Sequence, residues 1–256
     1  MFFDTHAHYD SSKFESDRDE VLRAVYASGV TLIVDPGDTV ERSKNAVALS
    51  QQYDHVYAAV GVHPEEWETW TDSSIDELRA LAQSPKVVAI GEIGLDYYWD
   101  KEHVELQKAM FRAQIELALE LDLPIIVHDR EAHGDCLTIA LDYPELRGVF
   151  HCFSGSAEMA KELLKRGWYL GFDGPITYKN AVKALEVIRV CPKDRMLLET
   201  DSPYLSPVPN RGKRNDSRNL SYIAEVIARE TGMTVEDVAV QTAENGKRLF
   251  RIGVNP

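Results

Sequence analysis

The sequence predicts an α/β protein that folds as one (β/α)8 barrel of the TIM type, and two observations lead to this fold class. Short apolar runs alternate with longer segments whose apolar residues lie three and four positions apart, which is the pattern of strands followed by helices. Eight such units occupy a chain of 256 residues, a typical length for this barrel. An open doubly wound sheet is the competing architecture, but its first strand usually leads into a glycine-rich turn. Here the first strand ends in the sequence DTHAH at residues 4–8 instead.

The strands and helices are predicted in order along the chain. The strands are rich in valine, isoleucine, leucine and aromatic residues, and they span Phe2–Thr5, Thr31–Asp35, Val56–Val62, Val87–Ile90, Leu123–His128, Gly148–His151, Trp168–Phe172 and Arg195–Glu199. The helices between them span Asp17–Ser28, Val40–Gln52, Ser74–Gln83, Lys101–Leu121, Gly134–Leu141, Ala157–Arg166 and Ala181–Val190. Two more helices follow the last strand, at Leu220–Thr231 and Val235–Phe250. Gly29, Gly167 and Gly232 lie where helices should end, because glycine readily adopts the left-handed backbone of a C-terminal cap.

Composition and charge narrow the class of protein. Hydrophobic residues make up 44% and charged residues 27% of the chain, as in an ordinary globular protein, so we expect a single domain over residues 1–256. The 42 acidic residues outnumber the 28 basic ones and give a net charge of −14, which excludes a broad basic surface for nucleic acid. The three cysteines are widely spaced, and no apolar run approaches the roughly 18 residues of a membrane span. These features predict a cytoplasmic monomer without a membrane segment.

Polar residues at the carboxyl ends of the strands are the candidates for chemistry, because these ends face the catalytic mouth of a barrel. His6 and His8 are two residues apart at the end of the first strand, so both imidazoles point to the same side. The ends of the fourth, fifth, sixth and eighth strands carry, in turn, Glu92, His128, His151 and Asp201. In a closed barrel, all of these side chains converge on one axial pocket.

Each of these residues alone has a structural explanation, as a buried salt-bridge partner or a hydrogen-bonded core histidine. Together they favour a metal site, because burying several unpaired charges in one place is very costly. Imidazole nitrogens combined with carboxylate oxygens suit zinc or manganese. Two such ions lower the pKa of a shared water and polarise a carbonyl or phosphoryl oxygen. The predicted reaction class is therefore hydrolysis, with Asp201 as the acceptor of the water's proton.

A covalent mechanism is the alternative chemistry. The chain has no G-x-S-x-G nucleophile elbow, and the serines of the FSGS segment at residues 153–156 are better placed to cap the following helix. Cys152 adjoins His151 but should point to the opposite side of its strand, so we expect this thiol to be structural.

Seven motifs, in this order along the chain, carry a family resemblance. They are DTHAHYD (4–10), GVHPEEW (61–67), GEIGLDYYWD (91–100), PIIVHDREA (124–132), HCFSGS (151–156), ETDSPYLSP (199–207) and RGKRN (211–215). Together they resemble the TatD family of metal-dependent deoxyribonucleases, which belongs to the amidohydrolase-like barrels, and the likeness runs from about residue 1 to residue 252. The resemblance implies a barrel hydrolase with two divalent ions (zinc, manganese or magnesium) and, in some relatives, a third.

The resemblance also implies which residues hold these ions. One ion would be bound by His6, His8, Glu92 and Asp201, and the other by Glu92, His128 and His151, so that Glu92 bridges the two. A third ion would use His63 and Glu199, although Glu199 could instead orient another ligand. Many amidohydrolases bridge their metals with a modified lysine, and Glu92 at this position separates the chain from typical amide-bond hydrolases of the superfamily.

The loop after the eighth strand predicts the class of substrate. A basic cluster lies there beside the metal-bearing strand end, and it consists of Arg211, Lys213 and Arg214 together with Asn215. Guanidinium groups at this place can bind phosphate oxygens, whereas the alternative is a solvated loop. Aromatic residues on the mouth-side loops either stack on bases or cover the rim of the barrel, and they are Trp67, Tyr97, Tyr98 and Trp99.

Three functions compete on these grounds. The first is an exonuclease that removes nucleotides from the 3′ end of single-stranded DNA, with RNA or abasic DNA as further substrates, because gripping a single-stranded end needs only a few phosphate contacts. The alternative keeps the metals but hydrolyses an ester or an amide, as a deacylase does. A binding role without catalysis is the least supported, because all of the principal metal ligands are present.

Overall fold

The computed structural model describes residues 1–253, which contain one sheet of eight parallel strands. The strands follow one another in chain order, and they are β1 (Phe2–Asp4), β2 (Val30–Pro36), β3 (Val56–Val60), β4 (Val87–Asp96), β5 (Ile125–Arg130), β6 (Gly148–Phe150), β7 (Tyr169–Phe172) and β8 (Met196–Leu198). The sheet curls until its two edges meet, where Thr5 donates its backbone N–H to the Leu198 carbonyl at 3.0 Å and Ala7 bridges to Ser202. The predicted (β/α)8 barrel is confirmed.

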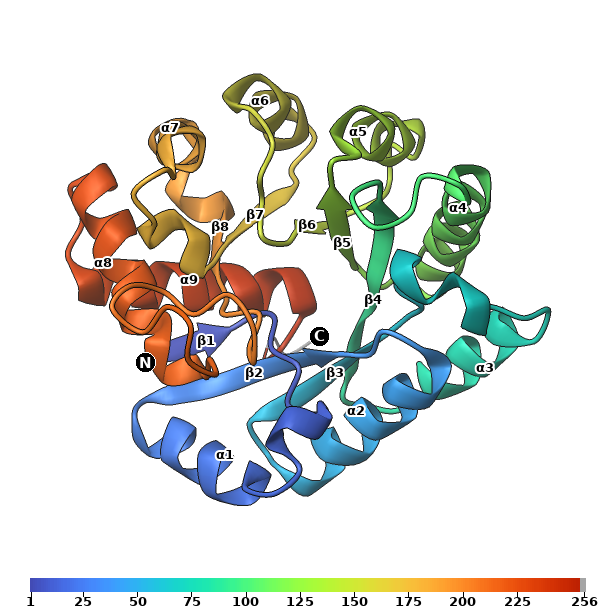
Figure 1. Ribbon diagram of the computed structural model, residues 1–256, viewed down its shortest axis with the longest axis horizontal. Helices are drawn as coiled ribbons and strands as arrows, with labels where there is room; N and C mark the ends of the chain where they lie inside the picture. The colour runs from blue at the N-terminus through green and yellow to red at the C-terminus, as the bar shows by residue number, and fades with distance from the viewer. Residues whose placement is uncertain (254–256) are drawn as a thin grey trace.

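Helices cover the outside of the sheet (Figure 1). They are α1 (Arg18–Ala27), α2 (Val40–Gln52), α3 (Ser74–Leu81), α4 (Val104–Glu120), α5 (His133–Asp142), α6 (Ala157–Lys165), α7 (Val182–Val190) and α8 (Leu220–Thr231). Short 3-10 helices lie at Ser12–Phe14, Pro64–Thr69, Gly174–Thr177, Lys193–Arg195 and Ser217–Asn219. Ser156 caps α6 as predicted, because its hydroxyl accepts the Met159 N–H at 3.3 Å. Within residues 1–253, no helix combines the length and apolar character needed to cross a membrane.

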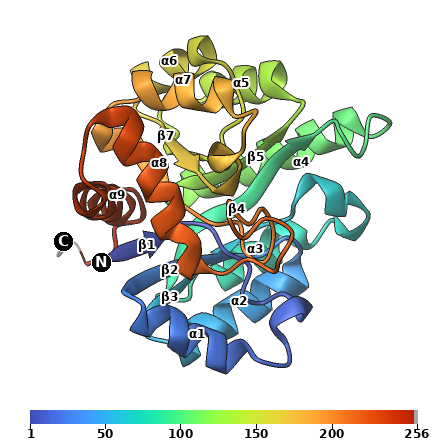
Figure 2. The same ribbon diagram turned by 60° about the vertical axis from the view of Figure 1, so that its left-hand side comes forward.

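The last helix, α9 (Val235–Phe250), closes the end of the barrel where the strands begin (Figure 2). The Phe250 ring lies 6.1 Å from the ring of Phe3 on β1. Leu249, Phe250 and Ile252 join the side chains inside the barrel in one buried apolar cluster. Because apolar packing seals this end, the polar residues inside the barrel gather at the opposite end, where the strands finish.

Strand β4 is longer than the sequence predicted, and this difference matters for the site. The predicted strand ends at Ile90, but β4 continues to Asp96 and every residue in it is buried. Gly94 explains the continuation: a β-carbon there would collide with the carbonyl oxygen of His128 on β5, and its φ of 148° suits only glycine. The glycine therefore lets β4 and β5 approach each other where the polar residues begin.

Candidate metal centre

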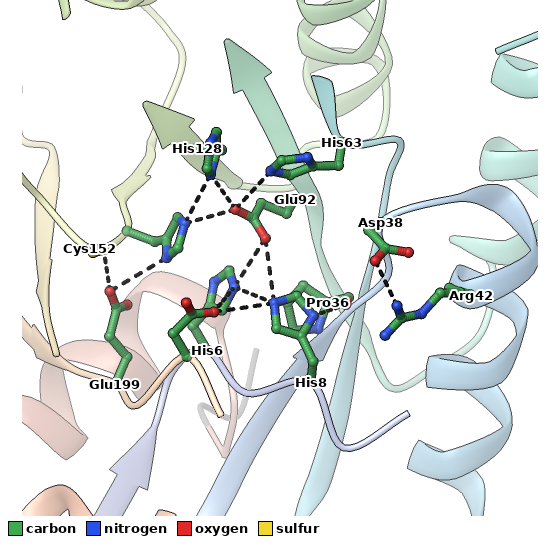
Figure 3. A network of polar contacts seen from close by, with 12 residues as sticks. His6, His8, Pro36, Asp38, Arg42, His63, Glu92, His128, Cys152 and Glu199 are labelled. Atoms are coloured by element: carbon green, nitrogen blue, oxygen red, sulfur yellow. Dashed lines mark hydrogen bonds and ion pairs between the residues drawn. The ribbon is translucent and has the colours of Figure 1, made fainter. Parts of the chain in front are cut away.

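Glu92 lies at the centre of a buried polar cluster at the carboxyl ends of the strands (Figure 3). Its two carboxylate oxygens face different sets of imidazoles. Oε2 lies 3.2 Å from His6 Nε2 and 3.6 Å from His8 Nε2. Oε1 faces the second set at 2.7 Å from His151 Nε2, 2.9 Å from His128 Nδ1 and 3.5 Å from His63 Nε2. One carboxylate thus joins two groups of nitrogen donors.

Asp201 completes the first set of donors. Its Oδ1 lies 3.4 Å from His8 Nε2 and 3.7 Å from His6 Nε2. The residue has a left-handed backbone (φ 54°), which aspartate tolerates better than most residues, and its N–H donates to the His6 carbonyl at 2.9 Å. His8 in turn donates its N–H to the Ser202 carbonyl at 2.7 Å. These reciprocal backbone bonds hold the segment after β1 against the segment after β8.

The donors in this cluster fit divalent cations of the zinc or manganese type. His6, His8, Glu92 and His151 are all buried, and clusters of three ligand atoms within 4.8 Å of one another form at His6–His8–Asp201, His6–Glu92–His151 and His63–Glu92–His128. Within the part of the chain that the structure describes, the buried Nδ1 atoms of His6 and His151 have no hydrogen-bond partner. Several imidazoles and two carboxylates buried this close together are a costly arrangement that a bound cation relieves.

The electrostatics of the cluster favour positive charge between the carboxylates. Burial by itself would raise the pKa of Glu92, but the neighbouring His151, His6 and His63 hold that pKa well below its usual range. Burial lowers the pKa of His6 to about 4, so its imidazole is neutral at pH 7, which is the form that ligates metals. Burial also acts to lower the pKa of His8, but the hydrogen bond and charge of Asp201 raise it to about 10. Glu92 and Asp201 are therefore ionised and can neutralise a bound cation, which would displace the proton of His8.

Asp96 is a site residue that the sequence analysis missed. Its Oδ2 lies 2.9 Å from Nε2 of His128, the ring whose Nδ1 faces Glu92. Its Oδ1 accepts the backbone N–H groups of Tyr98 and Trp99, each at 2.9 Å. The signal that could have found it is the alternation of a strand, because Glu92, Gly94 and Asp96 share one face of β4. That signal appears only when β4 is known to reach Asp96.

His63 and Glu199, which the resemblance pairs at a third ion, lie on different sides of the cluster. His63 faces Glu92 and His128. Glu199 is fully buried, accepts a hydrogen bond from the Cys152 N–H, and lies 3.7 Å from His151 Nδ1. Glu199 therefore lies against His151 and His63 against His128, and the assignment of these two residues to a third ion stays a prediction.

The four residues of the basic loop differ in their contacts. Asn215 is buried and donates its side-chain amide to the Thr200 carbonyl at 2.8 Å and the Tyr204 carbonyl at 2.7 Å, so it braces the loop that carries Asp201. Its contact with a substrate phosphate stays a prediction. Arg214 makes two hydrogen bonds to the Asp17 carboxylate at 2.9 Å and 2.6 Å and covers the Phe14 ring. Arg211 and Lys213 are exposed, and the Arg211 guanidinium lies 4.3 Å from the centre of the Tyr178 ring.

Comparison with known proteins identifies the family. A family model described as TatD related DNase matches residues 3–251. The chain belongs to the TatD-related DNase family. The TatD assignment agrees with the motifs around the candidate metal ligands, and it makes the chain a metal-dependent hydrolase.

Individual relatives within the TatD family match the whole chain. The chain is 46% identical over 254 residues to the "Uncharacterized metal-dependent hydrolase YabD" of Bacillus subtilis, covering 98% of this chain and 100% of that protein. It is 36% identical to the "3'-5' ssDNA/RNA exonuclease TatD" of Cronobacter sakazakii, covering 99% of each. The crystal structure of the TatD homologue YjjV from Escherichia coli K12 superposes with a TM-score of 0.93 at 32% identity, covering 98% of each chain. The predicted family and fold class are thereby confirmed.

Proposed function

We propose that this TatD-family hydrolase is an exonuclease that removes nucleotides from the 3′ end of single-stranded DNA or RNA. The observation that carries the proposal is the position of Glu92, whose two oxygens face two separate sets of metal donors. A paired metal site of this kind suits displacement at a phosphodiester. The Cronobacter relative, whose name states this activity, supports the choice of substrate.

The proposed ligands follow the two sides of Glu92. His6, His8 and Asp201 would hold one ion and His128 and His151 the other, with Glu92 shared between them. When bound, the ions supply a water of lowered pKa and neutralise the charge that develops on the phosphate. Zinc, manganese and magnesium are the candidate ions, and His63 is close enough to Glu92 Oε1 to assist the second one.

Asp201 is placed to accept the proton of the attacking water. Its Oδ1 faces His6 and His8, whereas Oδ2 makes no hydrogen bond among the described residues, and the side chain is 14% exposed. One oxygen can therefore act as a ligand while the other takes the proton. Outside the cluster, the exposed Arg211 and Lys213 are the basic groups that we propose for binding a substrate phosphate, because the neighbouring Arg214 is occupied by Asp17.

Shortening of an end-labelled single-stranded oligonucleotide tests the activity. We expect the wild-type protein loaded with Mn²⁺ or Mg²⁺ to shorten a 5′-labelled strand one nucleotide at a time, and Asp201→Ala to reduce the rate by at least about 100-fold, the usual size of a general-base effect. Metal-loaded protein that leaves both DNA and RNA strands intact contradicts the proposal.

Substitutions of the basic residues distinguish the exonuclease from the alternative ester or amide hydrolase. Arg211→Ala and Lys213→Ala should weaken cleavage of the oligonucleotide more than cleavage of a small ester, because only the oligonucleotide offers additional phosphates. Arg248→Ala is the matched control, since this exposed arginine lies on α9 at the opposite end of the barrel. Equal effects on both substrates, or activity on the ester alone, favour the deacylase alternative.

A further inference from the structure

An exposed aromatic pair lies beside the metal centre, immediately beyond β4. The side chains of Tyr98 and Trp99 are 50% and 62% exposed, although large aromatic residues usually bury most of their surface. Their ring centres lie 4.8 Å apart with an interplanar angle of 86°. The neighbouring Tyr97 behaves differently: its hydroxyl donates to Asp135 at 2.7 Å and its side chain packs on the core. Tyr97 thus covers the rim of the barrel, but this role does not explain why Tyr98 and Trp99 are exposed.

Arg130, at the end of β5, adds a guanidinium group to this pair. Its central carbon lies 4.0 Å from the centre of the Tyr98 ring and 5.4 Å from that of the Trp99 ring. Among residues 1–253 Arg130 makes no ion pair, whereas the adjacent Glu131 pairs with Lys101 at 4.0 Å. An unpaired, exposed guanidinium in a chain of net charge −14 retains its hydrogen-bond donors for an anionic ligand.

The aromatic pair is tied to the metal centre through Asp96. One oxygen of Asp96 accepts the backbone N–H groups of both Tyr98 and Trp99, and the other contacts His128. Arg130 is connected as well, because it follows His128 by two residues on β5, about 7 Å along the same face of the strand. Asp96 and Arg130 are also partners in the β4–β5 register. A ligand resting on these three side chains is therefore connected through Asp96 to the His128 side of the cluster.

We propose that Tyr98, Trp99 and Arg130 form a stacking subsite for one base of a single-stranded substrate, with the Arg130 guanidinium binding an adjacent phosphate; this rests on the proposed exonuclease function. Aromatic faces bind any base by stacking, so the subsite tolerates sequence variation. A base inside a duplex has both faces occupied by its neighbours. The subsite consequently selects unpaired ends, which gives an acidic protein a way to hold nucleic acid without a broad basic surface.

The experiment compares two phosphodiester substrates that differ in their bases. One is an oligothymidine of eight nucleotides, and the other is bis(p-nitrophenyl) phosphate, which has no base. For Trp99→Ala we expect the ratio of kcat/KM on the oligothymidine to kcat/KM on the small diester to fall by about 5- to 150-fold, mainly through KM, as expected for the loss of one stacked base. Arg130→Ala should lower the ratio as well, and Trp99→Phe should restore most of it. Tyr26→Ala, which removes another exposed tyrosine from α1 on the outside of the barrel, is the control and should leave the ratio unchanged.

A binding measurement separates this inference from the proposed function. Fluorescence anisotropy of labelled oligothymidine is measured with the Mn²⁺-loaded protein carrying Asp201→Asn to prevent turnover, with and without Trp99→Ala. If Trp99→Ala weakens binding of the oligothymidine but the wild type does not cleave it, the exonuclease function alone is overturned. Cleavage by the wild type with an unchanged ratio and unchanged anisotropy for Trp99→Ala and Arg130→Ala overturns the stacking subsite alone.

Discussion

Replacing Asp96 tests whether this carboxylate sets the proton position of His128. In Asp96→Asn, the oxygen that accepts the N–H groups of Tyr98 and Trp99 remains, but an amide NH₂ replaces the oxygen 2.9 Å from His128 Nε2. His128 Nε2 must then accept a hydrogen bond, so the imidazole proton moves to Nδ1. This is the nitrogen 2.9 Å from Glu92, and once protonated it cannot bind a cation.

The contacts of Asp96 give the expected size of the effect. Losing a carboxylate that orients a ligand histidine costs about 10- to 100-fold in metal affinity. Stability should change little in Asp96→Asn, because the turn keeps its hydrogen bonds. Asp96→Ala also leaves two backbone N–H groups without their acceptor, at about 1 kcal/mol each, which corresponds to a loss of roughly 4–8 °C in Tm.

Two measurements check this reasoning. Titration calorimetry of metal-stripped protein with Mn²⁺ should show one weakened site in Asp96→Asn, and thermal melts followed by circular dichroism in EDTA should separate the asparagine variant from the alanine variant. If Asp96→Asn binds Mn²⁺ as tightly as the wild type, or melts as early as Asp96→Ala, the proposed role of Asp96 in orienting His128 is wrong.

Three further predictions concern stability. Burial raises the pKa of Asp4 from 3.8 to about 6, so the free energy of unfolding contributed by this residue falls as the pH rises from 4 to 6. Urea melts should show the wild type losing about 2 kcal/mol over this range relative to Asp4→Asn, and parallel pH profiles of the two proteins contradict this. Gly94→Ala should destabilise the protein by at least about 2 kcal/mol, because the new β-carbon meets the His128 carbonyl. If urea melts show a smaller loss in the free energy of unfolding, β4 and β5 can move apart to make room for it. Phe250→Ala should cost about 3–5 kcal/mol by opening a cavity at the closed end of the barrel, and an unchanged melting curve would refute the sealing role of α9.

Much of the fold could be predicted because it depends on local patterns. The helices Val40–Gln52, Leu220–Thr231 and Val235–Phe250 begin and end where their apolar spacing predicts. Gly29, Gly167 and Gly232 have φ values of 97°, 83° and 70°, as predicted for residues that end helices. The end of β4 was missed because Gly91 and Gly94 indicate a strand break, whereas in the barrel they permit close approach to β5.

The sequence by itself determined which residues could meet at the mouth of the barrel. His6 and His8 share a side because strand residues alternate, and Glu92, His128, His151 and Asp201 each come at or beyond the predicted end of a strand. Only the tertiary structure decided how these residues divide around Glu92, that Asp96 supports His128, and that Asn215 braces a loop. These outcomes depend on distances between residues up to about two hundred positions apart, and such distances follow from the closure and register of the barrel, which no local pattern encodes.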